Sequence, residues 1–77
     1  MDYKRRINRI IDRAKLISEP LRDVCAVAEV SVSTFYRWQQ DDANPRLRTM
    51  LRALDAMDAH LTEREKNLVE QLTRGAA

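Results

Sequence analysis

The feature that most constrains this chain is an interruption between two short apolar stretches in residues 24–38, Val-Cys-Ala-Val-Ala-Glu-Val-Ser-Val-Ser-Thr-Phe-Tyr-Arg-Trp. The first stretch has the spacing of one helix face, and the pattern breaks just before Ser31. Serine is a preferred N-cap because its hydroxyl accepts a backbone N–H of the first turn, so a second helix is expected over about 32–39, burying Phe35 and Trp38. We therefore predict two short helices joined by a tight turn, a helix-turn-helix.

The rest of the chain also favours helices. Its 77 residues include one glycine and two prolines, and no run alternates apolar and polar residues as a half-buried strand would. Apolar residues recur at the 3.6-residue period over about 2–17 and again between Leu47 and Met57. The sequence therefore predicts an all-α fold in one domain spanning residues 1–77, near the lower size limit for a single core.

Helix-start signals divide these periodic stretches. Ser18, followed by Glu19 and Pro20, predicts the start of a second helix, because serine caps helices and proline is tolerated in a first turn. Thr62-Glu63-Arg64-Glu65 matches a capping box and predicts that a last helix begins there and ends at Gly75. The expected architecture is a compact bundle of about five helices.

Composition argues against several classes of protein. The single cysteine, Cys25, cannot form an internal disulfide, and no Cys/His set has metal-ligand spacing, so neither a metal nor a cofactor is expected. No apolar run approaches the length of a membrane span, and no apolar stretch follows the basic N-terminal residues as in a secretory signal, so a cytoplasmic location is expected. No catalytic motif or phosphate-binding loop occurs, which predicts neither an enzyme nor a small-molecule ligand. His60 is expected to be either a solvated residue or a residue at the C-terminal end of the fourth helix.

Charge is unevenly distributed along the chain, although the formal net charge is only +2. Residues 1–52 carry eleven Lys/Arg against seven Asp/Glu, whereas residues 53–77 carry three against five. The basic surplus in the first segment indicates a face that meets an anion such as nucleic acid, and the acidic tail is expected to serve another purpose.

The early residues of the helix at about 32–39 suit contact with DNA. In a helix-turn-helix the second helix enters the major groove with its N-terminal residues against base edges. Val32, Ser33 and Thr34 are small enough to let the backbone approach the bases. Arg37, one turn later, can donate two hydrogen bonds to a guanine. Val32 also suits contact with a thymine methyl group, and Tyr36 suits either a phosphate contact or packing at the groove edge.

Residues 24–57 resemble the helix-turn-helix of the Cro and lambda-repressor family. The resemblance rests on an apolar pair, a turn ending in Val-Ser, a Ser-Thr-apolar run followed by arginine, and Asn-Pro before an apolar helix. The matching segments are Val24-Cys25, Ala28-Glu29-Val30-Ser31, Ser33-Thr34-Phe35-Tyr36-Arg37-Trp38, Asn44-Pro45 and Leu47-Arg48-Thr49-Met50-Leu51. The order of elements is also similar to small phage activators of the lambda CII kind, so the resemblance implies a phage or bacterial DNA-binding regulator.

The resemblance also implies roles for individual residues. Base-edge contacts fall to Val32, Ser33, Tyr36 and Arg37. Phosphate contacts fall to residues near the starts of the second and third helices and beyond the third: Arg22, Ser31, Thr34, Gln40, Arg46 and Arg48.

Two positions depart from the family pattern. Glu29 stands where the family usually has a glycine with a left-handed backbone, a conformation that costs other residues about 1 kcal/mol. Asp41-Asp42 places two carboxylates in a loop that is usually basic, near where phosphates are expected.

The predicted last helix supplies a candidate dimer interface. Leu61, Leu68 and Leu72, with Val69 beside them, form a narrow apolar stripe close to heptad spacing, part of which has to close the monomer's own core. A lone helix-turn-helix makes few contacts, and such proteins typically bind half-sites as symmetric dimers. Residues 61–74 are therefore expected to form the dimerisation helix of a homodimer, with a higher oligomer left open.

The function that these patterns predict is a sequence-specific transcriptional regulator that binds double-stranded DNA. The sequence does not distinguish a repressor from an activator. The alternative is a small protein-interaction module, such as an anti-activator, antitoxin or polymerase-binding factor, built on the same bundle. Asp41-Asp42 and the modest net charge favour that alternative, whereas Ser33 and Arg37 oppose it.

Overall fold

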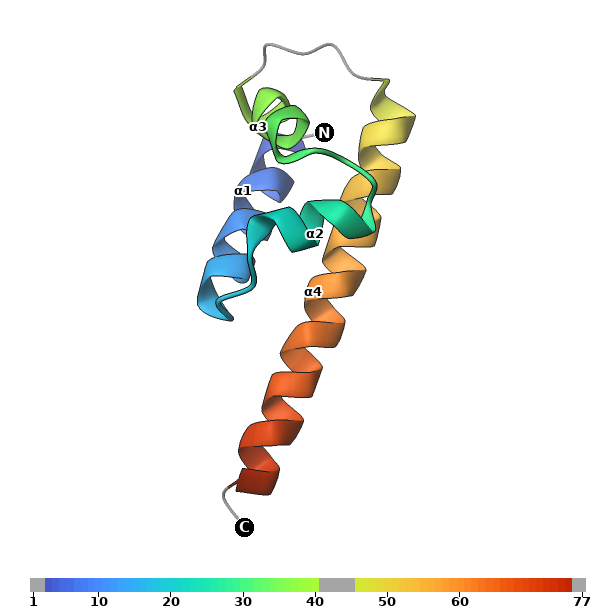
Figure 1. Cartoon of the computed structure of the whole chain (residues 1–77). Coiled ribbons are helices and arrows are strands. Elements are labelled where there is room, and N and C mark those ends of the chain that lie inside the picture. The colour runs from blue at the N-terminus through green and yellow to red at the C-terminus, as the bar shows by residue number, and fades with distance from the viewer. Residues whose placement is uncertain (1–2, 41–45, 76–77) are drawn as a thin grey trace.

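The computed structural model describes residues 3–40 and 46–75. These residues form four helices and no strand, which confirms the predicted all-α class. In Figure 1, α1 lies beside α4, α2 lies across α4, and α3 is seen almost along its axis above α2. The four helices are α1 (Tyr3–Leu16), α2 (Leu21–Val27), α3 (Val32–Gln40) and α4 (Leu47–Gly75).

The expected fourth and fifth helices are one continuous helix, so the count of about five is wrong for the described residues. α4 runs for 29 residues without interruption through the predicted capping box. No glycine or proline interrupts this helix before Gly75. Thr62 and Glu65, instead of capping α4, accept hydrogen bonds from Arg13 of α1.

Two residues after the last residue of α1, and again after that of α2, stands a residue other than glycine with a left-handed backbone. Ser18 has a φ of 56° and Glu29 a φ of 58°. After each helix, two backbone N–H groups reach back to carbonyls of the last turn: Ser18 and Glu19 to Lys15 and Ala14, and Glu29 and Val30 to Ala26 and Cys25. This is the Schellman arrangement, which satisfies the last carbonyls of a helix. Glu29 therefore adopts the backbone conformation that the family resemblance implied.

The predicted cap of α2 is wrong. Ser18 ends α1 instead of starting α2, and Pro20 stands at the N-cap of α2 without a side-chain hydrogen bond. The side chain of Glu19 turns inward, where only 8% of it is exposed and its Oε2 accepts a hydrogen bond from Nε of Arg64 at 2.7 Å. The chain between α1 and α2 is thus attached to α4.

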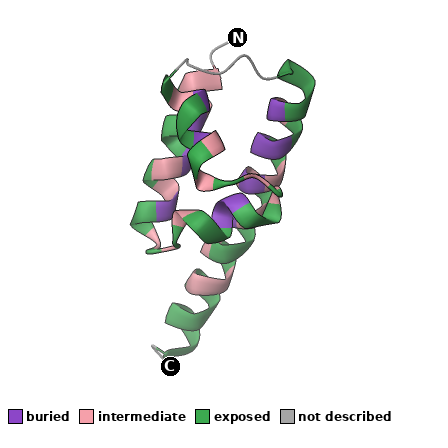
Figure 2. Cartoon of the chain, turned by 45° about the horizontal axis from the view of Figure 1, so that its top comes forward, coloured by how far each residue is buried: buried purple, intermediate pink, exposed green. Residues whose placement is uncertain are grey.

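The hydrophobic core lies between the four helices, and Figure 2 shows their buried residues on the sides that face inward. The rings of Phe35 and Trp38, whose burial was predicted, pack edge to face with centroids 6.4 Å apart. Leu61, expected at a dimer interface, is fully buried, because α1 and α2 still cover α4 at that height. Leu47, the first residue of the periodic apolar stretch that ends at Met57, is 52% exposed. The buried residues are Ile7, Ile10, Ala14, Val24, Cys25, Phe35, Trp38, Met50, Ala53, Leu54, Met57 and Leu61.

A row of ion pairs, which we call the charged seam, joins α1 to α4. Arg6 donates to Asp55 at 2.9 Å and to Asp58 at 2.6 Å. Arg13 donates to Asp58 at 3.1 Å, and also to Glu65. Residue numbers rise together on both sides, so α1 and α4 run in the same direction. The acidic tail thus neutralises part of the basic first helix.

The C-terminal end of α4 projects beyond the rest of the molecule. α1 ends near the height of Glu65, but α4 continues to Gly75, and Figures 1 and 2 show this end extending past α1 and α2. The molecule is accordingly elongated, with principal extents of 50 × 22 × 18 Å. Over the described residues, no helix is long and apolar enough to cross a membrane.

Candidate nucleic-acid interface

α3 has an inner apolar face and an outer polar face. Phe35 and Trp38 anchor its inner face in the core. Four side chains three or four residues apart stand on the outer face, because a helix turns about 100° per residue. All four are exposed, Tyr36 to the extent of 43%: Ser33, Tyr36, Arg37 and Gln40. The structure thus brings together three of the four residues expected at base edges, with Gln40 beside them.

The fourth expected base contact, Val32, is only partly available. Its side chain is half-buried and packs against the core cluster. The part that remains exposed lies at the first residue of α3, so a contact with a thymine methyl would use only that edge of the side chain.

Ser31 caps α3 as predicted. Its Oγ accepts a hydrogen bond from the backbone N–H of Thr34 at 3.1 Å, and donates one to the Oγ1 of Thr34 at 2.8 Å. The Ser31 hydroxyl is therefore fully engaged within the turn. Of these two expected phosphate contacts, Thr34 keeps a hydroxyl proton that it can donate to a ligand.

Gln39 fixes the position of α3 against α1, a role that the sequence did not indicate. Its side-chain amide donates to the Oδ1 of Asn8 at 3.0 Å. A polar pair 31 residues apart leaves no local pattern by which it could be recognised. The outer face of α3 is therefore held from behind both by the core and by this hydrogen bond.

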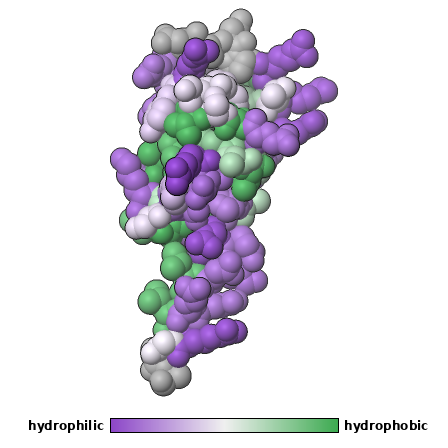
Figure 3. Space-filling view, viewed as in Figure 1, coloured by the Kyte–Doolittle hydropathy of each residue, from purple (hydrophilic) through white to green (hydrophobic). Residues whose placement is uncertain are grey.

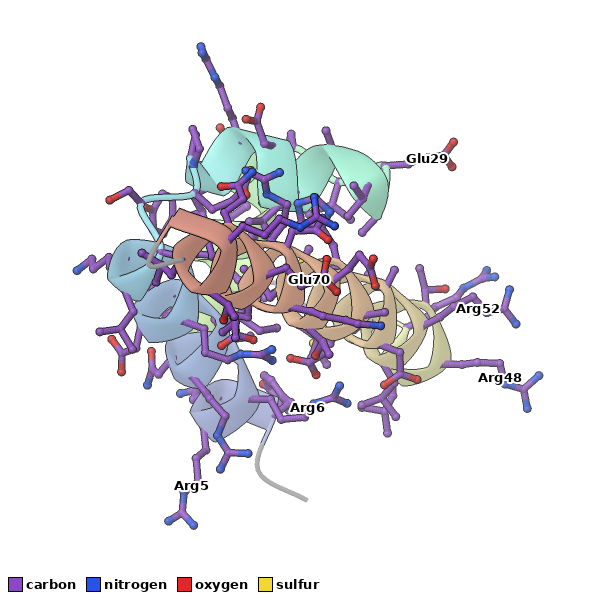
Figure 4. All side chains as sticks on the ribbon, turned by 90° about the horizontal axis from the view of Figure 1, so that it is seen from below. Arg5, Arg6, Glu29, Arg48, Arg52 and Glu70 are labelled. Carbon is purple, nitrogen blue, oxygen red and sulfur yellow. The ribbon has the colours of Figure 1, made fainter. Side chains whose placement is uncertain are left out.

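A group of exposed arginines lies on α3 and around the start of α4. Arg37, Arg46, Arg48 and Arg52 are exposed, and none of them forms an ion pair within residues 3–40 and 46–75. Figure 4 shows Arg48 and Arg52 extending from α4 on the side of the molecule where Glu29 also lies. Arg22 is exposed on α2, with its Nε 4.0 Å from Asp23. The expected loop residues Asp41 and Asp42 lie outside the described residues.

Arg6 and Arg13, by contrast, belong to the charged seam and are not available to a polyanion. Hydrogen bonds to Asp58 and then Asp55 raise the pKa of the Arg6 guanidinium further above its already high value. The basic surplus of the first segment is therefore only partly a surface property.

Cys25 and His60, the other titratable residues considered from the sequence, both lie within the packed part of the fold. Cys25 is buried, and burial raises the pKa of its thiol, so it is held as the unreactive neutral form. His60 does not end a helix, which was one of the two expectations, but lies inside α4 with its Nε2 3.8 Å from Oε1 of Glu19. Within the described residues, no three His, Cys, Asp or Glu side chains are grouped so that they could hold a metal ion.

Comparison of the chain with protein families, curated proteins and solved structures gives no match. The likeness to the Cro and lambda-repressor helix-turn-helix thus rests on the residues quoted above alone.

Proposed function

We propose that this chain is a sequence-specific DNA-binding regulator that inserts α3 into the major groove as the second helix of a helix-turn-helix. One observation carries the proposal: Ser33, Tyr36 and Arg37 stand together on the outer face of a helix whose inner face is anchored by two buried aromatic rings. A rigidly held helix with small residues first and an arginine one turn later has the chemistry that base readout requires.

The turn between α2 and α3 supports the same function. Glu29 closes α2 with a left-handed residue and Ser31 caps α3 two residues later, so the chain changes direction within Ala28–Ser31. A short connection of this kind sets α3 at a defined angle to α2. Arg46 and Arg48, together with Arg52, would supply the sequence-independent attraction to phosphates.

We further propose that the regulator acts as a homodimer joined at the projecting end of α4. Val69 and Leu72 are 62% and 72% exposed there, and Leu68 is half-buried, so three of the four residues expected at the interface remain accessible. Two copies would present two α3 helices to a pseudo-palindromic site.

The proposal is tested by selecting bound sequences from random DNA and then measuring affinity for the selected site. Arg37→Ala should weaken binding to that site by about 1–3 kcal/mol and relax selectivity at one position. Arg74→Ala, the same charge change at the far end of α4, is the matched control and should have little effect. Equal loss on selected and random DNA would make Arg37 a phosphate contact, and the absence of any selected sequence would overturn the function.

A protein-interaction module is the second candidate, and one observation favours it. An open groove of about 360 Å³ lies between the α2–α3 turn and α4. Its floor is formed by small or apolar residues, and Glu29 and Arg52 lie among the residues that line it. Substituting Ala56→Arg would fill this groove without touching α3. Loss of the chain's regulatory effect in cells in that variant, with DNA binding and α-helical content unchanged, would favour the groove over α3 as the functional surface.

A further inference from the structure

The most exposed apolar side chains at the lower end of the molecule come from two helices. Leu16, at the end of α1, is 84% exposed, and Val69 and Leu72 of α4 are nearly as accessible. Figure 3 shows hydrophobic residues following one side of the projecting end of α4, with hydrophilic residues on the other side. We call the group of Leu16, Leu68, Val69 and Leu72 the end strip.

The strip continues the core-facing side of α4 beyond the point where α1 stops. Leu61 and Leu68 are seven residues apart, and Leu61 and Leu72 eleven, so Leu68 and Leu72 each lie within about 20° of Leu61 around the helix. Leu61 is fully buried, whereas Leu72 is 72% exposed. The side of α4 that packs in the core is thus uncovered at its far end.

Leu16 stands at the end of α1, near the height on α4 at which this uncovered surface begins. Arg13 reaches Thr62 and Glu65, and α1 runs in the same direction as α4, so Leu16 stands about one turn further down the charged seam. Val69 stands one turn after Glu65 on α4. Leu16 and Val69 therefore continue the direction of the charged seam, but as an apolar surface.

The residues that border the strip allow it to meet a copy of itself. In a symmetric contact every charge near the two-fold axis faces its own kind, which is unfavourable. Beyond Leu68 the flanking positions on α4 include the uncharged Gln71 and Thr73, and the Thr73 hydroxyl already donates to the carbonyl oxygen of Val69 at 2.8 Å. Arg64, one turn before Leu68, is paired with Glu19. Glu65 is neutralised by Arg13, and the helical phase places Glu63 and Glu70 on the opposite side of α4.

We propose that the end strip binds the end strip of a second copy, so that Leu16 of α1 is part of the dimer interface; this rests on the proposed function. α1 and α2 occupy the same side of α4 up to the height of Glu65, and a partner helix cannot share that space. The two α4 helices therefore contact each other only over their last turns and diverge from there, in contrast to an extended coiled coil. Leu16, at the C-terminal end of α1 in each copy, completes the apolar contact.

The test compares Leu16→Glu and Leu72→Glu by sedimentation across a wide range of protein concentration, with circular dichroism as the folding control. Each change places two carboxylates in one apolar contact, so each should weaken dimerisation by about tenfold or more. Leu47→Glu is the matched control, since Leu47 is a 52% exposed leucine at the other end of α4. It should leave the dimer unchanged.

Cysteine cross-linking locates the contact independently. Leu16→Cys and Leu72→Cys should each give a covalent dimer under mild oxidation, whereas Leu47→Cys and the unmodified chain should not, because Cys25 is buried. A dimer that survives Leu16→Glu and resists cross-linking at position 16 would overturn the role of α1. A chain that stays monomeric at every concentration would overturn the whole interface.

Failure of this interface and failure of DNA binding are separable. Arg37→Ala should lose site selectivity but remain dimeric, whereas Leu16→Glu should become monomeric but keep weak, salt-sensitive binding to DNA through α3. If the chain dimerises through the end strip yet selects no DNA sequence, the proposed interface would be upheld and the proposed regulatory function would be overturned.

Discussion

The two halves of α4 have the same residue pattern but different surroundings. Leu61 and Leu72 lie on the same side of one helix; the first is fully buried and the second is 72% exposed. The difference lies in α1 and α2, which cover α4 only as far as about Glu65. An apolar stripe therefore specifies which side of a helix is to be covered, but the length of the neighbouring helices decides whether the chain itself covers it.

Replacing each of these two leucines with alanine should give the largest difference in stability between the two halves of α4. Leu61→Ala leaves a cavity in the core and should lower the free energy of unfolding by about 2–5 kcal/mol. Leu72→Ala should change it by less than about 0.5 kcal/mol at concentrations where the chain is monomeric. Chemical denaturation followed by circular dichroism measures both. Comparable losses would mean that the projecting end packs against the rest of the molecule.

The charged seam marks the boundary between the halves, and its last arginine gives the next largest effect. Arg13→Ala removes the donor shared by Asp58, Thr62 and Glu65, and should destabilise the fold by roughly 1 kcal/mol at low salt and less at high salt. Arg9→Ala is the matched control, because Arg9 is exposed on the same helix and has no ion pair among the described residues. A loss that does not depend on salt would assign Arg13 a packing role.

The smallest effect is expected in the turn that orients α3. Glu29 has a φ of 58°, a conformation that glycine adopts without steric cost, so Glu29→Gly should stabilise the fold by up to about 1 kcal/mol. Ala28→Gly, one residue earlier and with a φ of −97°, should instead destabilise it. If Glu29→Gly were destabilising, the Glu29 side chain would be contributing more than its backbone strain costs.

Much of the fold was predictable from local patterns, because those patterns had a single physical meaning. Phe35 and Trp38 could be placed in the core from helix phase, and Ser31 as a cap from its position after a break in that phase. Ser33, Tyr36 and Arg37, to which the family resemblance gave base-edge roles, share the outer face of α3. These inferences need only one helix at a time.

The predictions that proved wrong concern patterns that are compatible with two different packing partners. Thr62 and Glu65, three residues apart, fit a capping box, but the same spacing puts both side chains on one face of a continuous helix, where Arg13 reaches them. Leu61 likewise fits both a dimer stripe and a core. Choosing between such partners requires the position of α1 relative to α4, which depends on tertiary packing rather than on local sequence.

The continuity of α4 makes the distance and rotation between the two ends of the molecule a matter of residue count. Each residue between Leu61 and Leu68 adds about 1.5 Å of length and about 100° of rotation. A single insertion there would turn the α4 part of the end strip away from the side on which α1 and Leu16 end, without disturbing the core or α3. A seven-residue insertion would nearly restore its direction while moving it about 10 Å further out. The helix thus serves as a rigid spacer. Its helical phase, as much as its length, would fix how the α3 helices of two copies are oriented toward one DNA site.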